Sequence, residues 1–217
     1  MPKKIKALIP VRSGSVRVLN KNIRPFAGSS LLELKVKQLL KIPSLDGVVV
    51  NSNSDEMLDV ARGLGVETIK REEKYATSEV SMNDVYENMA ENMDCDFILY
   101  INCTNPLIRT KTIEDMLQTD FKEHDSINSA HLIKENLWKD GEPINYDPSC
   151  HPRSQDLPDI FALNFATSLI SRDNMIVYKN VVGKNPLMYN ISEEEGLDID
   201  NLIDFKIAEF LFTSREN

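Results

Sequence analysis

The chain has 217 residues and a formal net charge of −9 at pH 7, and 41% of its residues are hydrophobic and 27% charged. This length can build one well-buried domain, and we expect a single domain over residues 1–217. The acidic balance argues against nonspecific binding to nucleic acid or to anionic membranes, because both need a basic face. The sequence contains no transmembrane-length apolar run, no signal-peptide pattern and no CxxC pair, so we expect a cytoplasmic protein without disulfides or a zinc site.

The first 132 residues alternate between short apolar runs and longer amphipathic segments. Serines at the starts of the amphipathic segments are typical helix N-caps, as at Ser30, Ser54 and Ser81. The pattern predicts strands at residues 5–9, 48–50, 66–69, 97–101 and 126–132, with helices between them from about 31, 55, 82 and 110. Such alternation predicts an α/β fold with a mostly parallel sheet and ligands at the carboxyl ends of the strands.

The pattern changes after residue 133. Residues 134–160 contain the only tryptophan and little periodicity, and they predict an irregular excursion with a hairpin near Asp140-Gly141. Strands are expected at 163–171 and 186–191. A closing helix is predicted from Asn201 to Phe212, and its apolar stripe is formed by Leu202, Phe205, Ala208 and Leu211.

The stretch Leu8 to Asn22 reads LIPVRSGSVRVLNKN and follows the first predicted strand. Gly14 and its neighbouring serines allow backbone N–H groups to approach an anion closely, and Arg12, Arg17 and Lys21 supply positive charge. The loop therefore suits a polyphosphate, although a solvated basic loop after an edge strand would have the same composition. It matches neither the P-loop nor the dinucleotide-binding fingerprint.

This loop resembles the signature of sugar-acid cytidylyltransferases, which runs approximately IPARxGSKRxxxKN. The resemblance is strongest to the CMP-sialic acid synthetases (acylneuraminate cytidylyltransferases) and weaker to the CMP-KDO synthetases. The matching residues are Pro10, Arg12, Gly14, Ser15, Arg17, Lys21 and Asn22. Val16 departs from the pattern, because the family usually has a lysine there. The resemblance implies a Rossmann-like nucleotidyltransferase A-type fold, with a mostly parallel sheet flanked by helices.

Three further segments extend the resemblance along the chain. The region of Arg71 and Ala76-Thr77-Ser78 corresponds to a nucleoside-holding loop, with Glu72 and Ser78 as departures. The turn NCTNPLIR from Asn102 to Arg109 corresponds to QPTSPLR, and Asn102 replaces the glutamine. The segment from His151 to Ala166 corresponds to RQDLPxxYxxNGA, whose matching residues include Gln155 and Asn164, with Phe165 replacing the glycine. Without the resemblance, each segment could equally be an ordinary polar loop or turn.

The sequence GLDID places Asp198 and Asp200 two residues apart in an extended segment, so both carboxylates point to one side. Paired carboxylates suit Mg²⁺, although Asp200 could instead be the N-cap of the closing helix. The resemblance favours the metal, because the family carries a late DID motif followed by DF, which Asp204-Phe205 match. It implies that Asp198 and Asp200 hold Mg²⁺.

The resemblance implies transfer of CMP from CTP to a 2-keto sugar acid, such as sialic acid or a related nonulosonic acid, with release of pyrophosphate. The expected catalytic residues are Arg12, Arg17 and Lys21. The expected nucleotide-binding residues are Pro10, Arg12, Ser13, Gly14, Ser15, Asn22, Arg71, Ala76 and Ser78. The expected substrate-binding residues are Asn102, Thr104, Arg153, Gln155 and Asn164.

The family forms homodimers in which the irregular excursion crosses to the partner, and residues 134–160 suit that role. We expect a homodimer that binds CTP and a sugar acid and neither nucleic acid nor a membrane. Two alternatives remain open. The chain could be a related nucleotidyltransferase with another nucleotide or sugar, or a nucleotide-binding homologue that has lost catalysis, as the departures at Val16, Ser78 and Phe165 suggest.

Overall fold

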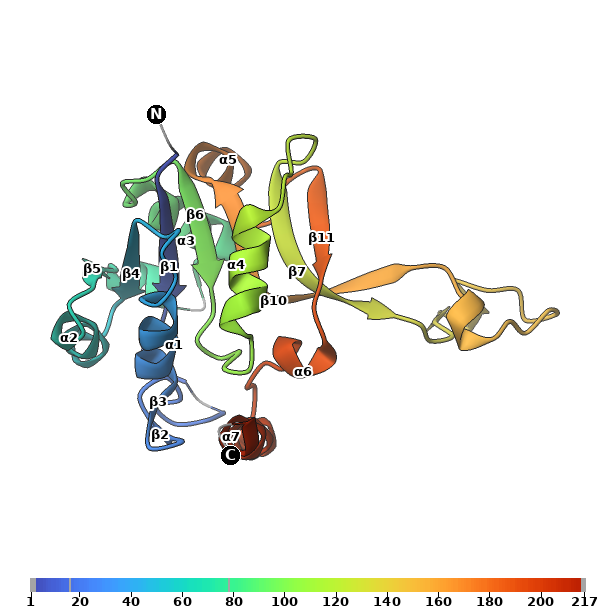
Figure 1. The fold of residues 1–217 in the computed structure, drawn as a ribbon, viewed down its shortest axis with the longest axis horizontal. Helices are drawn as coiled ribbons and strands as arrows, with labels where there is room; N and C mark the ends of the chain where they lie inside the picture. The colour runs from blue at the N-terminus through green and yellow to red at the C-terminus, as the bar shows by residue number, and fades with distance from the viewer. Residues whose placement is uncertain (1–2, 16, 78, 216–217) are drawn as a thin grey trace.

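A computed structural model describes residues 3–15, 17–77 and 79–215 of the chain. A central sheet of seven strands is covered by helices on both faces, and an extended arm leaves one side of this body (Figure 1). The strand order is β11-β7-β10-β6-β1-β4-β5. The strands are β1 (Ile5–Pro10), β4 (Gly47–Ser52), β5 (Glu67–Lys70), β6 (Phe97–Ile101), β7 (Ser126–Ile133), β10 (Ile160–Ser171) and β11 (Pro186–Asn190).

Two layers of helices enclose the sheet. One apolar cluster contains side chains of α1 (Leu31–Leu39), α2 (Asp55–Gly63), α4 (Thr110–Gln118) and α7 (Leu202–Arg215). A second cluster contains side chains of α3 (Met82–Glu91) and α5 (Arg172–Tyr178). Successive residues of β1 alternate between the two clusters, since Ala7 and Ile9 belong to the first and Leu8 to the second. The period of two in a strand thus explains why the run is apolar throughout.

The predicted helix starts are confirmed. The hydroxyls of Ser30, Ser54 and Ser81 accept hydrogen bonds from backbone N–H groups three residues later. Two short elements that the sequence did not predict follow β1, namely β2 (Pro25–Phe26) and β3 (Ser29–Ser30), which pair with each other. The 3-10 turn η1 (Glu73–Ala76), α5 and the short helix α6 (Glu193–Gly196) were also not predicted. These elements are too short to show a clear hydrophobic period.

β10 is the strand that departs from the parallel order. It runs antiparallel to both β6 and β7, while β6, β1, β4 and β5 run parallel to one another and β11 is parallel to β7. The first half of β10 pairs with the end of β7 beyond the body of the sheet. These two strands form the base of the arm.

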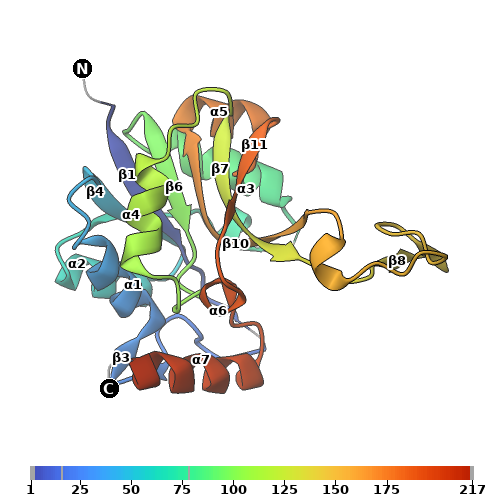
Figure 2. The same ribbon diagram turned by 45° about the vertical axis from the view of Figure 1, so that its right-hand side comes forward.

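The arm comprises residues 134–159 and projects from the body in both ribbon views (Figures 1 and 2). It contains the predicted hairpin at Asp140-Gly141, formed by β8 (Trp138–Lys139) and β9 (Glu142–Pro143), and the 3-10 turn η2 (Ser154–Asp156). Trp138 and Ile144 on the arm are more than half exposed. The irregular excursion expected from the sequence is therefore a real structural unit that lies outside the core.

The closing helix differs in part from the prediction. Phe205 and Ala208 are buried and Leu211 is half-buried, as expected, but Leu202 is exposed. No helix among the described residues is long and apolar enough to cross a membrane. The three cysteines carry free thiols.

Candidate active site

Two adjoining hollows lie beyond the ends of β1, β5 and β6. The first has a volume of about 340 Å³ and is lined by residues that include Pro10, Arg12, Asn22, Arg71, Asn102 and Thr104. The second has a volume of about 290 Å³ and is lined by Arg12, Gly14, Ser15, Arg17, Val18, Lys21 and Asp200. Arg12 lines both hollows, which we call together the crevice. The crevice thus gathers residues from the start, the middle and the end of the chain, at the edge where parallel sheets bind ligands.

The cationic loop and the aspartate pair meet across the second hollow. Arg17 Nη2 donates to Asp200 Oδ1 at 2.8 Å, and Lys21 Nζ donates to the carbonyl oxygen of Ile199. The side chains of Arg17 and Asp200 remain 69% and 51% exposed. An exposed ion pair of this kind contributes about 0–1 kcal/mol, so a charged ligand can readily replace it.

The alternative role for Asp200, as a helix cap, is wrong. Asn201 Oδ1 accepts from the backbone N–H groups of Ile203 and Asp204, and Asp204 Oδ2 accepts from those of Asp200 and Asn201. This reciprocal arrangement is a capping box that begins at Asn201. The carboxylate of Asp200 is consequently available to the crevice.

The electrostatics of Asp198 suit a cation. Burial and, to a smaller extent, the charge of Asp200 raise the pKa of Asp198, while Thr104 and Lys21 oppose this rise. Asp200 lines the second hollow, and Asp198 lies close enough to be affected by its charge, so the pair provides hard oxygen ligands of the kind that Mg²⁺ prefers. The donor set therefore fits a magnesium ion. No group of three or more His, Cys, Asp or Glu side chains suited to a metal is found in the described ranges, so water and substrate oxygens would complete the coordination.

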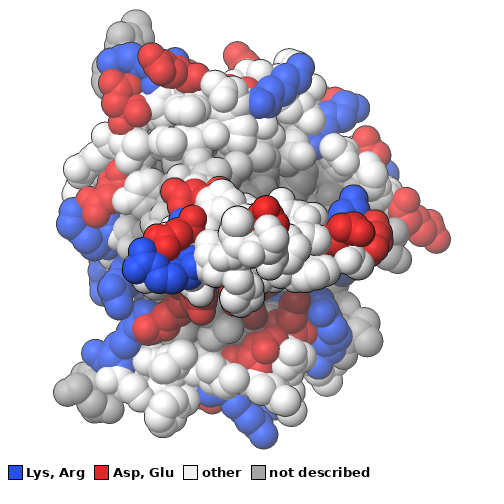
Figure 3. Space-filling view, turned by 90° about the vertical axis from the view of Figure 1, so that its right-hand side faces the viewer, with Lys and Arg blue, Asp and Glu red and all other residues white. Residues whose placement is uncertain are grey.

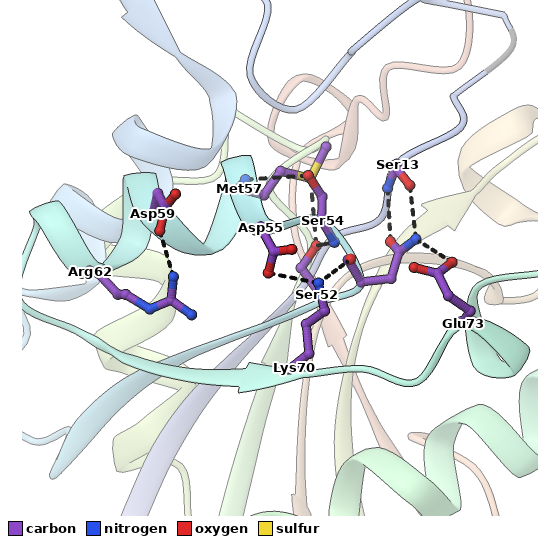
Figure 4. A network of polar contacts seen from close by, with 10 residues as sticks. Ser13, Ser52, Ser54, Asp55, Met57, Asp59, Arg62, Lys70 and Glu73 are labelled. Atoms are coloured by element: carbon purple, nitrogen blue, oxygen red, sulfur yellow. Dashed lines mark hydrogen bonds and ion pairs between the residues drawn. The ribbon is translucent and has the colours of Figure 1, made fainter.

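Asn53 fixes the beginning of the cationic loop. Its Oδ1 accepts from Ser13 N at 3.0 Å, and its Nδ2 donates to Ser13 Oγ at 2.8 Å and to Glu73 Oε2 at 3.0 Å. The same region includes Lys70, whose Nζ donates to the Asn53 carbonyl and to Asp55 (Figure 4). Ser13 therefore anchors the loop, and its hydroxyl already accepts a hydrogen bond from Asn53.

Arg71 and Asn22 are buried at the wall of the first hollow. Arg71 Nε donates to Asn51 Oδ1 at 2.6 Å and Nη2 donates to the Asn51 carbonyl at 3.1 Å. Burial lowers the pKa of Arg71 to about 10, which leaves it charged near neutral pH. Asn22 Oδ1 accepts from the buried thiol of Cys103. Both side chains are thus held in fixed positions beside the hollow, as expected for groups that orient a ligand.

The 70–81 loop approaches the cationic loop directly. Arg12 Nη1 donates to the Ala76 carbonyl at 2.8 Å, so Ala76 contributes through its backbone. Ser78 and the departure at Val16 lie outside the described residues, and the prediction for Ser78 stays a prediction.

The turn after β6 lines the first hollow with Asn102 and Thr104. Asn102 Nδ2 donates to the Phe165 carbonyl at 2.9 Å, and the Thr104 carbonyl accepts from Ile199 N at 2.9 Å. This turn therefore connects β10 to the segment that carries the aspartates. Phe165 has a φ of +53°, in the left-handed region that favours glycine. A glycine, which is usual in the family at this position, adopts such a conformation without steric strain, whereas Phe165 adopts it with a side chain.

Three predicted acceptor residues do not line the crevice of their own chain. Arg153 and Gln155 belong to or flank η2 on the arm, and Arg153 pairs with Asp156 at 2.7 Å. Asn164 lies in β10, where its Oδ1 accepts from Ser129 Oγ and Ala166 N. Its buried Nδ2 has no partner within the described part of the chain. The roles of these residues in substrate binding remain predictions.

Two groups of residues that support the site were given no individual role from the sequence. Asn51 and Asn53 hold Arg71 and the loop, and the only signal was their place after a predicted strand. Glu195 is buried, and its Oε1 accepts from Arg109 N at 2.9 Å and Thr112 Oγ1 at 2.6 Å. These two hydrogen bonds connect α6, which lies just before the aspartates, to the start of α4. Nothing in the run of three glutamates distinguished Glu195 from its exposed neighbours.

The chain as a whole is acidic, with 34 Asp and Glu residues against 25 Lys and Arg residues. On the face toward which the arm projects, Asp and Glu side chains gather directly beneath the arm (Figure 3). Arg12, Arg17 and Lys21 form a local concentration of positive charge in this acidic chain. An anionic ligand would be directed to them by the local field.

Comparisons with known proteins agree with this geometry. The family profile described as "Cytidylyltransferase" matches residues 6–143, which is more than half of the chain. The chain belongs to the cytidylyltransferase family. The match begins in β1 and includes the cationic loop, Arg71 and the turn at Thr104. The family resemblance inferred from the sequence motifs is thereby confirmed.

Several characterised proteins of this family are similar over nearly the whole chain. The flagellin modification protein B of Campylobacter coli is 24% identical, with 97% of this chain and 96% of that protein covered. The CMP-N,N'-diacetyllegionaminic acid synthase of Campylobacter jejuni is 25% identical, with coverages of 96% and 95%. N-acylneuraminate cytidylyltransferase A of Danio rerio is 26% identical over 94% of this chain, which spans only 50% of that longer protein.

Solved structures confirm the fold class. A CMP:2-keto-3-deoxy-manno-octonic acid synthetase solved with CTP superposes with a TM-score of 0.75 at 15% identity and covers 98% of this chain and 99% of that one. A 4-diphosphocytidyl-2C-methyl-D-erythritol synthase from Anaerococcus prevotii gives a TM-score of 0.73 at 9% identity, with coverages of 97% and 96%. The mostly parallel sheet flanked by helices is thus the nucleotidyltransferase fold expected from the sequence.

Proposed function

We propose that the protein transfers CMP from CTP to a 2-keto sugar acid of the nonulosonic type and releases pyrophosphate. The observation that carries this proposal is the meeting of Arg17 and Lys21 with the Asp198–Asp200 segment across one crevice. The names of relatives that act on acylneuraminic, legionaminic and pseudaminic acids support the class of acceptor. In the reaction, the anomeric hydroxyl attacks the α-phosphorus of CTP, and pyrophosphate leaves.

The chain's own contribution to this reaction is positioning and charge neutralisation. Arg12, Arg17 and Lys21 line the hollow that would receive the triphosphate, and they would stabilise the departing pyrophosphate. Arg17 can exchange its exposed ion pair with Asp200 for a phosphate oxygen at little cost. Asp198 and Asp200 would hold Mg²⁺, which, when bound, neutralises phosphate charge.

The first hollow would receive the nucleoside and the acceptor. Asn22 and the buried Arg71 would fix the cytidine, because their side chains are already held in place. Asn102 would orient the acceptor from the end of β6. No side chain in the crevice is arranged as an evident general base among the described residues, so the attacking hydroxyl would lose its proton to solvent water.

Arg153 and Gln155 would act in a second copy of the chain. Both lie on the projecting arm, away from the crevice of their own subunit, and the arm exposes Trp138 and Ile144. A homodimer in which each arm reaches over the partner's crevice would bury these apolar side chains and deliver a cation to the carboxylate of the acceptor. The dimer and this delivery in trans are part of the proposal.

The proposed activity is tested by pyrophosphate release from CTP and Mg²⁺ with a panel of nonulosonic acids. The variant Asp200→Asn should fold normally, because Asp200 is exposed, and should lose at least about 100-fold in kcat/KM, the scale of one lost electrostatic contact in a transition state. The matched control is Asp59→Asn on α2, an exposed carboxylate paired only with Arg62. It should keep full activity.

The outcome of the panel separates the proposal from its alternatives. Turnover with another nucleoside triphosphate but not with CTP would identify a related nucleotidyltransferase with a different nucleotide. CTP binding without turnover on any acceptor would identify a homologue that has lost catalysis. Wild-type rates in Asp200→Asn would remove the magnesium role from the aspartate pair.

A further inference from the structure

A separate hollow of about 380 Å³ lies away from the crevice, between α1, the turn before α4 and the end of α7. Five basic side chains line it, namely Lys35, Lys37, Lys41, Arg109 and Arg215, and no acidic residue does. The whole chain has 34 acidic against 25 basic side chains, so this concentration of positive charge runs against its overall balance. We call this hollow the basic pocket.

Two of these cations have no partner within the part of the chain that the structure describes. The side chains of Lys41 and Arg109 are exposed and take part in no hydrogen bond or ion pair found in the described ranges. Lys37 pairs with Glu33, and Arg215 pairs with Glu194, but neither glutamate lines the pocket. The pocket therefore presents net positive charge to whatever enters it.

Lys35 distinguishes this pocket from an ordinary basic surface. Its side chain is only 2% exposed, and Nζ donates to Gln38 Oε1 at 2.9 Å and to the Asn105 carbonyl at 3.1 Å. Neither partner carries charge, so the buried amine lacks a counter-ion among the described residues. A buried ammonium without an anion is costly, and a bound anion in the pocket would supply what the protein does not.

We propose that the basic pocket is a second binding site, for the phosphate or diphosphate group of a small molecule. Arg109 would bind phosphate oxygens through its planar fork, with Lys41 and Lys35 as point charges. Apolar side chains, including Leu34 and Phe212, form the remaining wall and accommodate an organic body on the phosphate. The volume lies in the usual range for small-molecule sites. Burial lowers the pKa of Lys35 to about 7, and a neighbouring anion would favour its charged form.

The basic pocket shares a structural element with the crevice. Pro106, Ile108 and Arg109 line the pocket, while Asn102 and Thr104 of the same turn line the crevice. Lys35 holds the middle of that turn through the Asn105 carbonyl. A ligand in the pocket would thus contact the same turn that lines the crevice, through different residues of it. The inference does not depend on the proposed function, because it uses only residues outside the crevice.

The test is calorimetric titration with inorganic pyrophosphate and, separately, with CMP, at low salt and without added metal. Because phosphates should also enter the crevice, three variants are compared. The first is Lys41→Ala with Arg109→Ala, which removes the two unpartnered cations. The second is Arg17→Ala with Lys21→Ala in the crevice. The third is the control Lys111→Ala, an exposed lysine of α4 outside the pocket.

The wild-type protein should show two binding events for at least one probe. The Lys41 and Arg109 variant should lose one event, with affinity at that site weakened at least tenfold, while the crevice variant and the control keep it. Circular dichroism should show an unchanged fold, since both removed side chains are unpartnered. If pyrophosphate is the tighter probe, the site takes a free inorganic anion; if CMP is tighter, it takes a phosphate ester.

Two results would overturn the proposal. One is that neither probe binds the crevice variant at concentrations up to about 1 mM, which corresponds to only about 4 kcal/mol of binding free energy. The other is that the Lys41 and Arg109 variant retains every wild-type binding event.

Discussion

The buried Lys35 makes the stability of the protein depend on pH in a specific way. Burial lowers its pKa from the ordinary value of 10.5 to about 7 in the folded state. Between these two values the unfolded chain holds a proton on Lys35 that the folded chain does not. Raising the pH through this window therefore favours the folded state, and below about pH 7 the full cost of burying the charge remains.

The magnitude follows from the linkage between pKa and stability. Each pH unit inside the window changes the free energy of unfolding by up to about 1.4 kcal/mol. Between pH 7.5 and 9.0 the wild type should therefore gain about 2 kcal/mol relative to Lys35→Met, which has no proton to release at this position. The prediction concerns how the difference in free energy of unfolding between wild type and Lys35→Met changes with pH. The loss of the hydrogen bonds to Gln38 and Asn105 changes this difference by the same amount at every pH.

The measurement is urea unfolding of both proteins at several pH values, followed by circular dichroism. Trp138 is the only tryptophan and lies on the arm, so its fluorescence would not report on the core. Lys37→Met is the matched control, since Lys37 lies on the same helix and is 50% exposed. Parallel stability profiles for wild type and Lys35→Met, or a difference that shrinks as the pH rises, would refute the reasoning.

Two further substitutions test how the segments around the crevice are held. Glu195→Gln should lower the free energy of unfolding by about 1–3 kcal/mol in urea titrations, because the buried carboxylate accepts from Arg109 N and the Thr112 hydroxyl. Phe165→Gly should raise the thermal midpoint or leave it unchanged, because the relief of about 1 kcal/mol of left-handed backbone strain offsets the greater freedom of glycine in the unfolded chain.

Each of these has a matched control. Glu193→Gln alters an exposed member of the same acidic run and should leave stability within about 0.5 kcal/mol of wild type. Phe161→Gly alters an exposed phenylalanine of the same strand that is absent from the positive-φ positions, and it should destabilise the protein. Equal effects of Glu195→Gln and Glu193→Gln would show that the bonds of Glu195 contribute nothing. A larger loss at Phe165 than at Phe161 would show that the left-handed backbone carries no strain.

The alternating half of the fold could be predicted from the sequence. Ser30, Ser54 and Ser81 predicted the starts of three helices, because the capping hydrogen bonds that they accept span only three residues. The apolar runs of β1, β4 and β6 predicted the interior of the sheet. The cationic loop and the two aspartates were also visible as local patterns, together with the family that they imply. Local propensity and short motifs carry this information without help from distant residues.

Which charged residues are buried, and which residue is strained, became visible only in the folded molecule. Lys35 and Glu195 look like their exposed neighbours in the sequence, and their burial depends on contacts with residues about 70 and 80 positions away. Long-range strand pairing likewise sets the antiparallel direction of β10 and the left-handed backbone of Phe165. It also places Arg153 on the arm, outside the crevice of its own chain. Burial and strand direction are set by non-local packing, which overrides what a window of sequence can show.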